Sequence, residues 1–230
     1  MISWLFLGVV AMNCAAALVL LRALIYRRPI YRPMLLNIGL SVAPVLVLAV
    51  TLAGLTVAAL LQSPVVLWVV MIIGGLVWLV LLPNAGYLIT ELNMSHRRAD
   101  DPVPLWYDIV AVLSLTLSGV LNTVLNVLLV QFLVSALVDP NTIRPFELGW
   151  VWVTGGVILL LVSFGIYLGR YLRFNSWDLM HPRSFVGKLV EHFREPGRLA
   201  STALFCVLHT IFVAIVYLVT VAPIATRPLG

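Results

Sequence analysis

Residues 105–137 form the stretch LWYDIVAVLSLTLSGVLNTVLNVLLVQFLVSAL, which decides the fold class. It holds one charged residue, Asp108, near its start. It is longer than the roughly 20 residues that a helix needs to cross a hydrocarbon core about 30 Å thick. Lipid offers no hydrogen bonds to backbone N–H and C=O groups, so a continuous apolar run of this length must be helical. The stretch therefore predicts a transmembrane helix.

Similar apolar runs recur along the chain, in which only 10% of the 230 residues are charged and the mean hydropathy is +1.10. A soluble domain would carry about a quarter charged residues, and the strands of a membrane barrel would alternate apolar and polar residues. We therefore predict an all-α fold, a polytopic membrane bundle of six transmembrane helices plus a cytoplasmic interfacial amphipathic helix. One transmembrane domain is expected over residues 1–230. Its expected spans are residues 2–25, 34–61, 65–83, 105–137, 147–171 and 199–224.

The basic residues indicate the orientation of these spans. Twelve of the 14 Lys and Arg residues follow the first, third and fifth spans. Short cytoplasmic loops are enriched in Lys and Arg, so we expect these loops in the cytoplasm and both termini outside. The net charge of +5 flanks the membrane rather than forming one basic stripe, so no nucleic-acid partner is expected.

The loop between the third and fourth spans carries the first polar segment. Pro83 and Asn84 are expected to end or kink the third span, because proline lacks a backbone donor, and a short amphipathic piece is expected next. Trp106 and Tyr107 suit the aromatic belt of a membrane interface. Asp108 lies inside the span, where a carboxylate costs a few kcal/mol unless it is paired. We therefore expect an arginine or a metal ion beside it.

A second polar segment follows the fifth span. Arg170 and Arg173 share a helix face, where they either snorkel to lipid headgroups or bind a ligand. Asn175 starts a turn rich in capping residues. Asp178 and His181 lie three residues apart, a spacing that suits either capping and ion pairing or a metal ion.

Residues 183–195 predict an amphipathic helix at the interface. Apolar side chains recur there at helical spacing, and charged side chains occupy the remaining positions. We assign these charges, including His192, to the wet face of the helix and place no catalysis there.

A polar stripe runs along the fourth span. Ser114, Ser118, Asn122 and Asn126 recur every four residues and so lie on one helix face. Hydrogen bonds between helices explain such a stripe, and a permeation path is the alternative. His209 in the sixth span is either a functional ionisable group or a neutral imidazole bonded to Asn122 or Asn126.

Three strings, LPNAGYLITEL at 82–92, PLWYD at 104–108 and GIYLGRYLRFNSWDL at 165–179, resemble a bacterial integral-membrane family called domain of unknown function family 1361. Gly86 stands where that family usually has proline, which loosens the turn but removes no chemical group. The resemblance implies a multi-pass protein, expected in the bacterial cytoplasmic (inner) membrane, and it carries over no catalytic role and no cofactor.

Our first hypothesis is a polar site at the cytoplasmic membrane face that joins the two polar segments. The expected partner of the protein is membrane lipid. The group bound at the site is expected to be a lipid headgroup, a small polar ligand or a divalent cation. The predicted ligand-binding residues are Asn84, Tyr87, Thr90, Glu91, Trp106, Asp108, Arg170, Arg173, Asn175, Trp177 and Asp178. If the site turns over a substrate, the catalytic candidates are Asp108, Glu91 and Asp178, with Arg170 stabilising negative charge. The metal-ligand candidates are Asp178 and His181.

Other hypotheses stay open from the sequence. An intramembrane pair of Asp108 and Asp178 could share a proton, although both lie near the interface. A small transporter would use the polar stripe and His209, although no inverted repeat of three helices is visible. A structural protein would use the same acids only to lock helix ends through ion pairs. Oligomer formation is also open.

Overall fold

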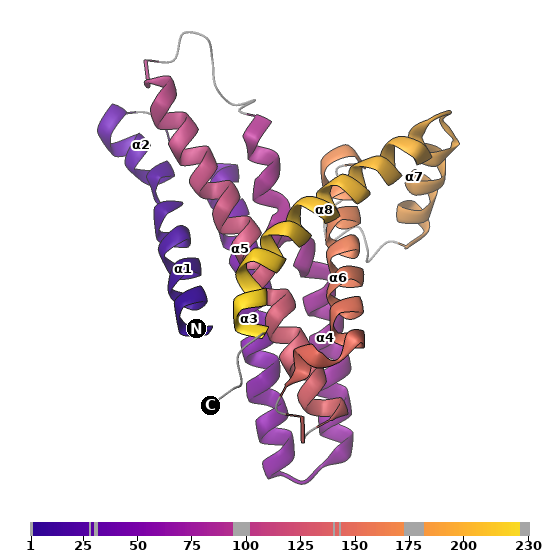
Figure 1. Ribbon diagram of the computed structural model, residues 1–230. Helices are drawn as coiled ribbons and strands as arrows, with labels where there is room; N and C mark the ends of the chain where they lie inside the picture. The colour runs from indigo at the N-terminus through magenta and orange to yellow at the C-terminus, as the bar shows by residue number, and fades with distance from the viewer. Residues whose placement is uncertain are drawn as a thin grey trace. The chain divides into compact units, whose positions relative to one another are not determined.

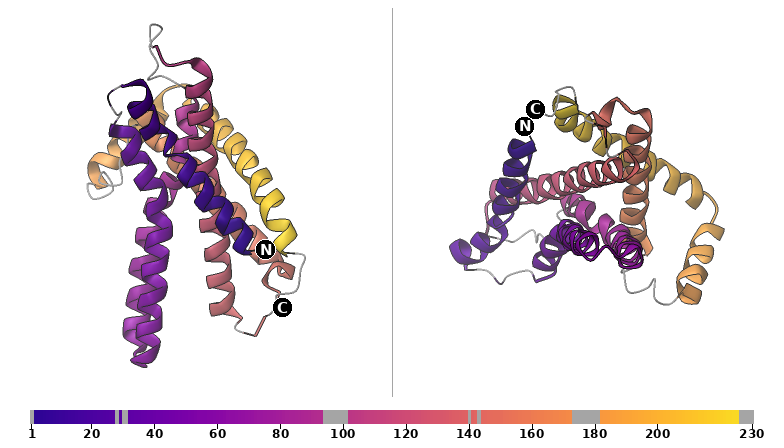
Figure 2. Two further views of the ribbon diagram at one scale, coloured as in Figure 1. Left: turned by 90° about the vertical axis from the view of Figure 1, so that its left-hand side faces the viewer. Right: turned by 90° about the horizontal axis from the view of Figure 1, so that it is seen from below.

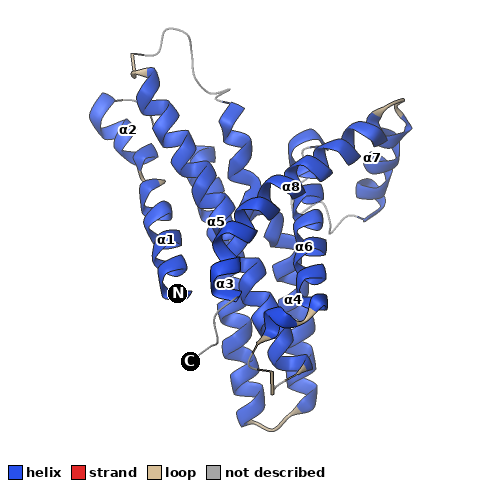
Figure 3. Ribbon diagram, viewed as in Figure 1, coloured by secondary structure: helices blue, strands red, loops and turns tan. Residues whose placement is uncertain are grey.

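The computed structural model describes residues 2–27, 29, 32–93, 102–139, 141–142, 144–172 and 182–225. Within these ranges every regular element is a helix and none is a strand (Figure 3). The predicted all-α fold is confirmed. The chain forms two compact units, which we call the N-terminal unit (Phe6–Asn126) and the C-terminal unit (Val127–Gly230 with Met1–Leu5). The single domain over residues 1–230 stays a prediction.

The N-terminal unit is built around a helical hairpin. Its elements are most of α1 (Ile2–Ala15), α2 (Leu18–Tyr26), α3 (Arg32–Leu60), α4 (Pro64–Tyr87), the 3-10 helix η1 (Leu88–Asn93) and α5 (Leu105–Val138) up to Asn126. Helices α3 and α4 lie side by side (Figures 1 and 2). Ser63 caps α4 by accepting a hydrogen bond from the Val66 N–H at 3.4 Å, and Pro64 occupies the first turn, where its missing donor costs nothing.

The C-terminal unit contains the second half of the membrane helices. Its elements are the rest of α5, the 3-10 turn η2 (Pro145–Glu147), α6 (Gly149–Tyr167), the π-helical segment η3 (Leu168–Leu172), α7 (Pro182–Arg194) and α8 (Arg198–Ala225). Helix α6 packs against α8, and α7 contacts both η3 and α8. Gly197, with φ of +80°, makes the turn between α7 and α8, a conformation that costs little for glycine.

Among the residues that the structure describes, six helical segments are long and apolar enough to cross a membrane, so the chain is a multi-pass membrane protein. They are Leu5–Tyr26, Arg32–Leu60, Pro64–Leu92, Leu105–Val138, Gly149–Leu172 and Arg198–Pro223. Their boundaries lie within three residues of the expected ones except at the end of the third. The first is interrupted at Ala16 and Ala17, where the Ala17 N–H bonds to the Cys14 carbonyl at 2.9 Å in place of a regular helical bond.

The third segment continues past its expected end at residue 83. Helix α4 runs through Pro83 to Tyr87, and η1 continues it to Asn93 as the expected short second piece. Side chains stabilise the backbone around the proline. Asn84 Nδ2 donates to the Leu81 carbonyl at 3.0 Å, and Ser41 Oγ donates to the Ala85 carbonyl at 2.9 Å. These bonds compensate for the donor that proline removes, so the helix does not end there.

Two packed clusters fix one end of the N-terminal unit. The first contains Ala16, Val19, Leu88 and Leu115, with Met34, Leu35 and Ile38 against it. The second contains Val103, Tyr107 and Ala111, with Leu18 and Tyr26 against it. Both clusters include residues of the α1–α2 segment and of α5. Gly119 allows a further close approach, because a Cβ there would lie 2.8 Å from the Ala85 carbonyl oxygen.

Candidate functional site

Asp108 forms an ion pair with Arg22 at this end of the N-terminal unit. Arg22 Nε donates a hydrogen bond of 2.8 Å to Asp108 Oδ1. The Asp108 side chain is only 9% exposed, and that of Arg22 is 25% exposed. The expected arginine partner of Asp108 is confirmed. Sequence indicated Arg22 only as an orientation signal, because it lies 86 residues before Asp108.

Glu91 is a second buried carboxylate at the same end, with 8% of the residue exposed. Its Oε1 accepts a hydrogen bond of 3.1 Å from Asn37 Nδ2. Asn37 lies on α3 amid apolar neighbours, so no pattern in the sequence marks it as a site residue. Thr90 Oγ1 donates to the Tyr87 carbonyl at 2.8 Å, so the threonine hydroxyl stabilises the turn that carries Glu91.

The remaining predicted site residues of this unit have other surroundings. Tyr87 and Asn84 are half-buried, and the Asn84 amide bonds to its own helix. Trp106 is 63% exposed, and its ring meets that of Tyr107 edge-on at 5.8 Å between centroids. Of the predicted ligand-binding residues in the N-terminal unit, Glu91 and Asp108 are therefore the two buried charges.

We call Arg22, Asn37, Glu91 and Asp108 the end cluster. Arg22 lies three residues after Val19 on α2, and Glu91 lies three residues after Leu88 on η1, so each shares a helix face with a member of the first packed cluster. The Tyr107 hydroxyl donates to the Leu18 carbonyl at 2.7 Å and ties α5 to α2 beside Asp108. Four elements, α2, α3, η1 and α5, thus supply the end cluster.

The chemistry of the end cluster suits a charged or zwitterionic group. Carboxylates bind ammonium groups and hard cations, and a guanidinium binds phosphates. In the part of the chain that the structure describes, no group of three or more His, Cys, Asp or Glu residues could hold a metal ion.

The predicted site residues of the second polar segment are only partly described. Arg170 lies in η3 of the C-terminal unit and is half-buried. Arg173, Asn175, Trp177, Asp178 and His181 lie outside the described residues. A site that joins the two polar segments, the metal site at Asp178 and His181, and the shared proton of Asp108 and Asp178 therefore stay predictions.

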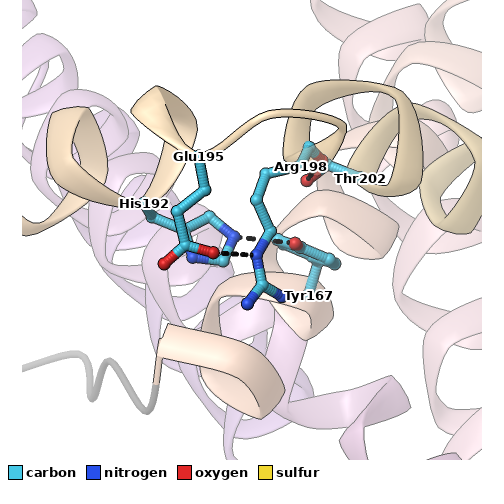
Figure 4. Close-up of polar contacts among 5 residues, drawn as sticks. All are labelled: Tyr167, His192, Glu195, Arg198 and Thr202. Carbon is cyan, nitrogen blue, oxygen red and sulfur yellow. Dashed lines mark hydrogen bonds and ion pairs between the residues drawn. The ribbon is translucent and has the colours of Figure 1, made fainter.

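A polar corner in the C-terminal unit was missed by the sequence analysis (Figure 4). His192 Nε2 forms a hydrogen bond of 2.8 Å with the hydroxyl of Tyr167, which is 2% exposed. The assignment of His192 to a wet face is therefore wrong, because this residue anchors α7 to α6. Arg198 Nε donates to Glu195 Oε2 at 2.6 Å. This hydrogen bond, and then the charge of Arg198, lower the pKa of Glu195 below its usual value of 4.5.

The polar stripe of α5 bonds to neighbouring helices, as one of its two interpretations predicted. Asn122 and Asn13 exchange two hydrogen bonds, of 2.8 and 3.1 Å, and Asn122 Nδ2 also donates to Ser41 Oγ at 2.9 Å. Trp78 Nε1 donates to Asn126 Oδ1 at 2.9 Å. We call these five residues the amide network, which links α1, α3, α4 and α5 within the N-terminal unit.

His209 and Gln131 belong to the C-terminal unit. His209 Nδ1 lies 3.2 Å from the Phe205 carbonyl of its own helix, and its ring stacks on Phe205. Asn122 and Asn126 belong to the N-terminal unit, so the bond of His209 to one of these amides, which was one of two interpretations, stays a prediction. Gln131 Nε2 donates to the Val151 carbonyl at 2.7 Å, and the Tyr217 hydroxyl donates to Gln131 Oε1.

Comparison with known proteins gives a family and no further relative. A model of the family described as "Protein of unknown function (DUF1361)" matches residues 36–216, which is well over half of the chain. No curated protein and no solved structure matches.

Proposed function

We propose that this chain, which belongs to the DUF1361 family, binds a polar group at the end cluster of its N-terminal unit. The observation that carries the proposal is the burial of two carboxylates, Asp108 and Glu91, at the end of a bundle of membrane helices. Arg22 is a quarter exposed, which gives a ligand access to the edge of the cluster.

Desolvation favours a binding role over a purely structural one. An ion pair removed from water loses hydration that its mutual attraction rarely repays, and apolar side chains of similar volume often stabilise a fold as well or better. The pair of Arg22 and Asp108 therefore joins α2 to α5 at a high cost in desolvation free energy. A ligand that uses these charges gives a reason for keeping them.

A lipid headgroup is the ligand that the surroundings support best. Trp106 is exposed beside Tyr107, and tryptophan and tyrosine are enriched at the depth of the headgroups. A zwitterionic headgroup carries an ammonium for the carboxylates and a phosphate for Arg22. A divalent cation would use only the carboxylates, and an anionic small ligand would use only Arg22.

The orientation and location belong to the same proposal. The distribution of Lys and Arg supports a cytoplasmic position for the end cluster, with both termini outside and the protein in a bacterial inner membrane. We place α7 at the cytoplasmic interface, because both of its ends connect to membrane segments within the C-terminal unit.

The amide network supports binding rather than conduction. A solute path along α5 would need polar groups free to receive the solute, whereas Asn122 and Asn126 bond to Asn13, Ser41 and Trp78. These bonds explain the stripe as an interhelical lock.

The test is ligand-induced stabilisation of the purified full chain in detergent. The probes are short-chain phosphatidylethanolamine, short-chain phosphatidylglycerol and Mg²⁺, and the measurement is the thermal unfolding midpoint. A ligand present at 100 times its Kd stabilises a protein by about 2.7 kcal/mol. We expect phosphatidylethanolamine to raise the midpoint of the wild type and to have little effect on Asp108→Asn and Glu91→Gln.

Glu147→Gln is the matched control, since it removes one carboxylate from an exposed pair with Arg144. It should respond to phosphatidylethanolamine as the wild type does. A response to Mg²⁺ alone would reassign the site to a cation. No response of the wild type to any probe, or a full response in both end-cluster variants, would contradict the proposal.

A further inference from the structure

Helix α7 leaves an apolar edge exposed between two arginines. Residues 183, 186, 190 and 194 are spaced by three and four positions and so share one face of the helix. Val186 is 52% exposed and Val190 is 45% exposed, and Arg183 and Arg194 at the two ends of this face are exposed as well. Among the described residues, neither arginine has an ion-pair partner.

A different face of α7 is held by the protein. Phe185, Leu189, His192 and Phe193 are half-buried, and His192 bonds to the buried Tyr167 hydroxyl. The ring of Tyr167 also meets those of Tyr171 and Phe205, so the anchor is an aromatic cluster formed by α6, η3 and α8. This anchor fixes the rotation of α7 about its own axis and keeps the valine edge away from the protein-facing side.

We propose that the Val186–Val190 edge of α7 inserts at the membrane surface and that Arg183 and Arg194 bind the phosphates of anionic phospholipids. The inference rests on the interfacial position proposed above for α7 and is independent of the end cluster. Valines beside arginines match the two layers of an interface, because the apolar side chains enter the acyl boundary while the guanidinium groups reach the phosphates.

Charge complementarity selects the kind of lipid. Helix α7 carries the basic residues Arg183, Lys188 and Arg194 against one acid, Glu191. Each basic side chain near an anionic membrane surface strengthens binding roughly fivefold. Arg183 and Arg194 lie 11 positions apart on the exposed face, so they reach different lipid molecules. A surface of zwitterionic lipid offers no net charge to these residues.

The test is hydrogen–deuterium exchange, read by mass spectrometry, on the full chain in nanodiscs. Discs of phosphatidylcholine alone are compared with discs that also contain phosphatidylglycerol. We expect the amides of residues 183–194 to exchange several-fold more slowly when phosphatidylglycerol is present. Arg183→Gln with Arg194→Gln should abolish this difference, and Val186→Ser with Val190→Ser should speed exchange in both kinds of disc.

The matched control is Arg27→Gln with Arg144→Gln, which removes two exposed positive charges outside α7 and should change nothing in residues 183–194. If the valine variant exchanges faster but phosphatidylglycerol has no effect, the interfacial position stands and binding of anionic lipid is overturned. If neither the valines nor the lipid matters, the interfacial position fails as well. All of these side chains are exposed, and circular dichroism of each variant verifies its helix content.

Discussion

Two arginine–carboxylate pairs occupy different regions of the molecule and have nearly the same local geometry. Arg22 donates from Nε to Asp108 at 2.8 Å, and Arg198 donates from Nε to Glu195 at 2.6 Å. Their surroundings differ. The side chains of the first pair are 25% and 9% exposed, whereas those of the second are 45% and 59% exposed. The first pair also spans 86 residues of chain and the second only three.

Bond length therefore does not decide the role of an ion pair in this protein. An exposed pair competes with water and contributes little to the stability of the fold. Breaking a buried pair leaves a charge where water cannot solvate it, so its loss costs several kcal/mol. Arg198 and Glu195 shape a turn between neighbouring helices, while Arg22 and Asp108 join elements far apart in the sequence.

The largest expected effect is that of Arg22→Ala. Removing the guanidinium leaves the buried Asp108 carboxylate without its arginine, and we expect a loss of about 3 kcal/mol in the free energy of unfolding, at the low end for buried pairs because Arg22 is partly exposed. Unfolding of the purified protein in a detergent titration measures this loss.

The matching control for that experiment removes both charges. Arg22→Met with Asp108→Leu removes both charges of this pair, so it should recover most of the stability that Arg22→Ala loses. If Arg22→Ala is as stable as the wild type, the buried pair contributes no more to stability than an exposed pair does.

Gly119→Ala tests close packing without removing a charge, and we expect it to lower the free energy of unfolding by about 2 kcal/mol. The added Cβ would lie 2.8 Å from the Ala85 carbonyl oxygen and 2.9 Å from the Leu88 Cβ. Helix α5 would have to move away from α4 and η1, which shifts Glu91 relative to Asp108. Gly75→Ala on α4 is the control, since its Cβ meets nothing within 4 Å. Equal unfolding midpoints for the two variants would refute the close approach.

Asn122→Ala measures how much a buried neutral side chain contributes to stability, for comparison with the buried pair of Arg22 and Asp108. It removes the exchange with Asn13 and the bond to Ser41, and we expect a loss of about 1 to 2 kcal/mol. Because no charge is involved, the loss should be the same at every pH. Thr56→Val is the control, since its exposed hydroxyl bonds only to a carbonyl of its own helix. If Asn122→Ala loses as much free energy of unfolding as Arg22→Ala, breaking a buried charged contact costs no more than breaking a buried neutral one.

The smallest expected effect is that of the exposed pair. The pKa of Glu195 is lower in the folded protein than in the unfolded chain, so its contribution to stability is present above the usual value of 4.5 and is lost as the pH falls through the folded pKa. The unfolding midpoint of Glu195→Gln should therefore lie slightly below that of the wild type at neutral pH and converge with it in acid. A difference between the two unfolding midpoints that grows in acid would contradict this expectation.

The membrane helices were predictable because their signal is local. A span needs only a long apolar run. The asparagines of α5 recur four residues apart, and this spacing indicated hydrogen bonds between helices. The continuation of α4 through Pro83 was not predictable, because its stabilising contacts include Ser41 from another helix. The interruption at Ala16 and Ala17 has no marker either, since alanine is a good helix former.

The end cluster was only half predictable for the same reason. Asp108 and Glu91 stood out as acids beside apolar runs, which made them candidates. Arg22 and Asn37 are ordinary for their positions and gain a role only when α2 and α3 pack against α5 and η1. His192 was misjudged because helical spacing shows which residues share a face, but not which face meets Tyr167.

The long chain separation of Arg22 and Asp108 also sets an order of events during synthesis. At 5–20 residues per second, Asp108 leaves the ribosome roughly 4 to 17 seconds after Arg22. The hairpin of α3 and α4 is complete in the meantime, since only Leu61–Ser63 separate its helices. Until then Asp108 is not available to Arg22, and we expect this arginine to reach toward the lipid headgroups. We therefore expect the insertion of α5 to bring Asp108 to Arg22 and to close the N-terminal unit.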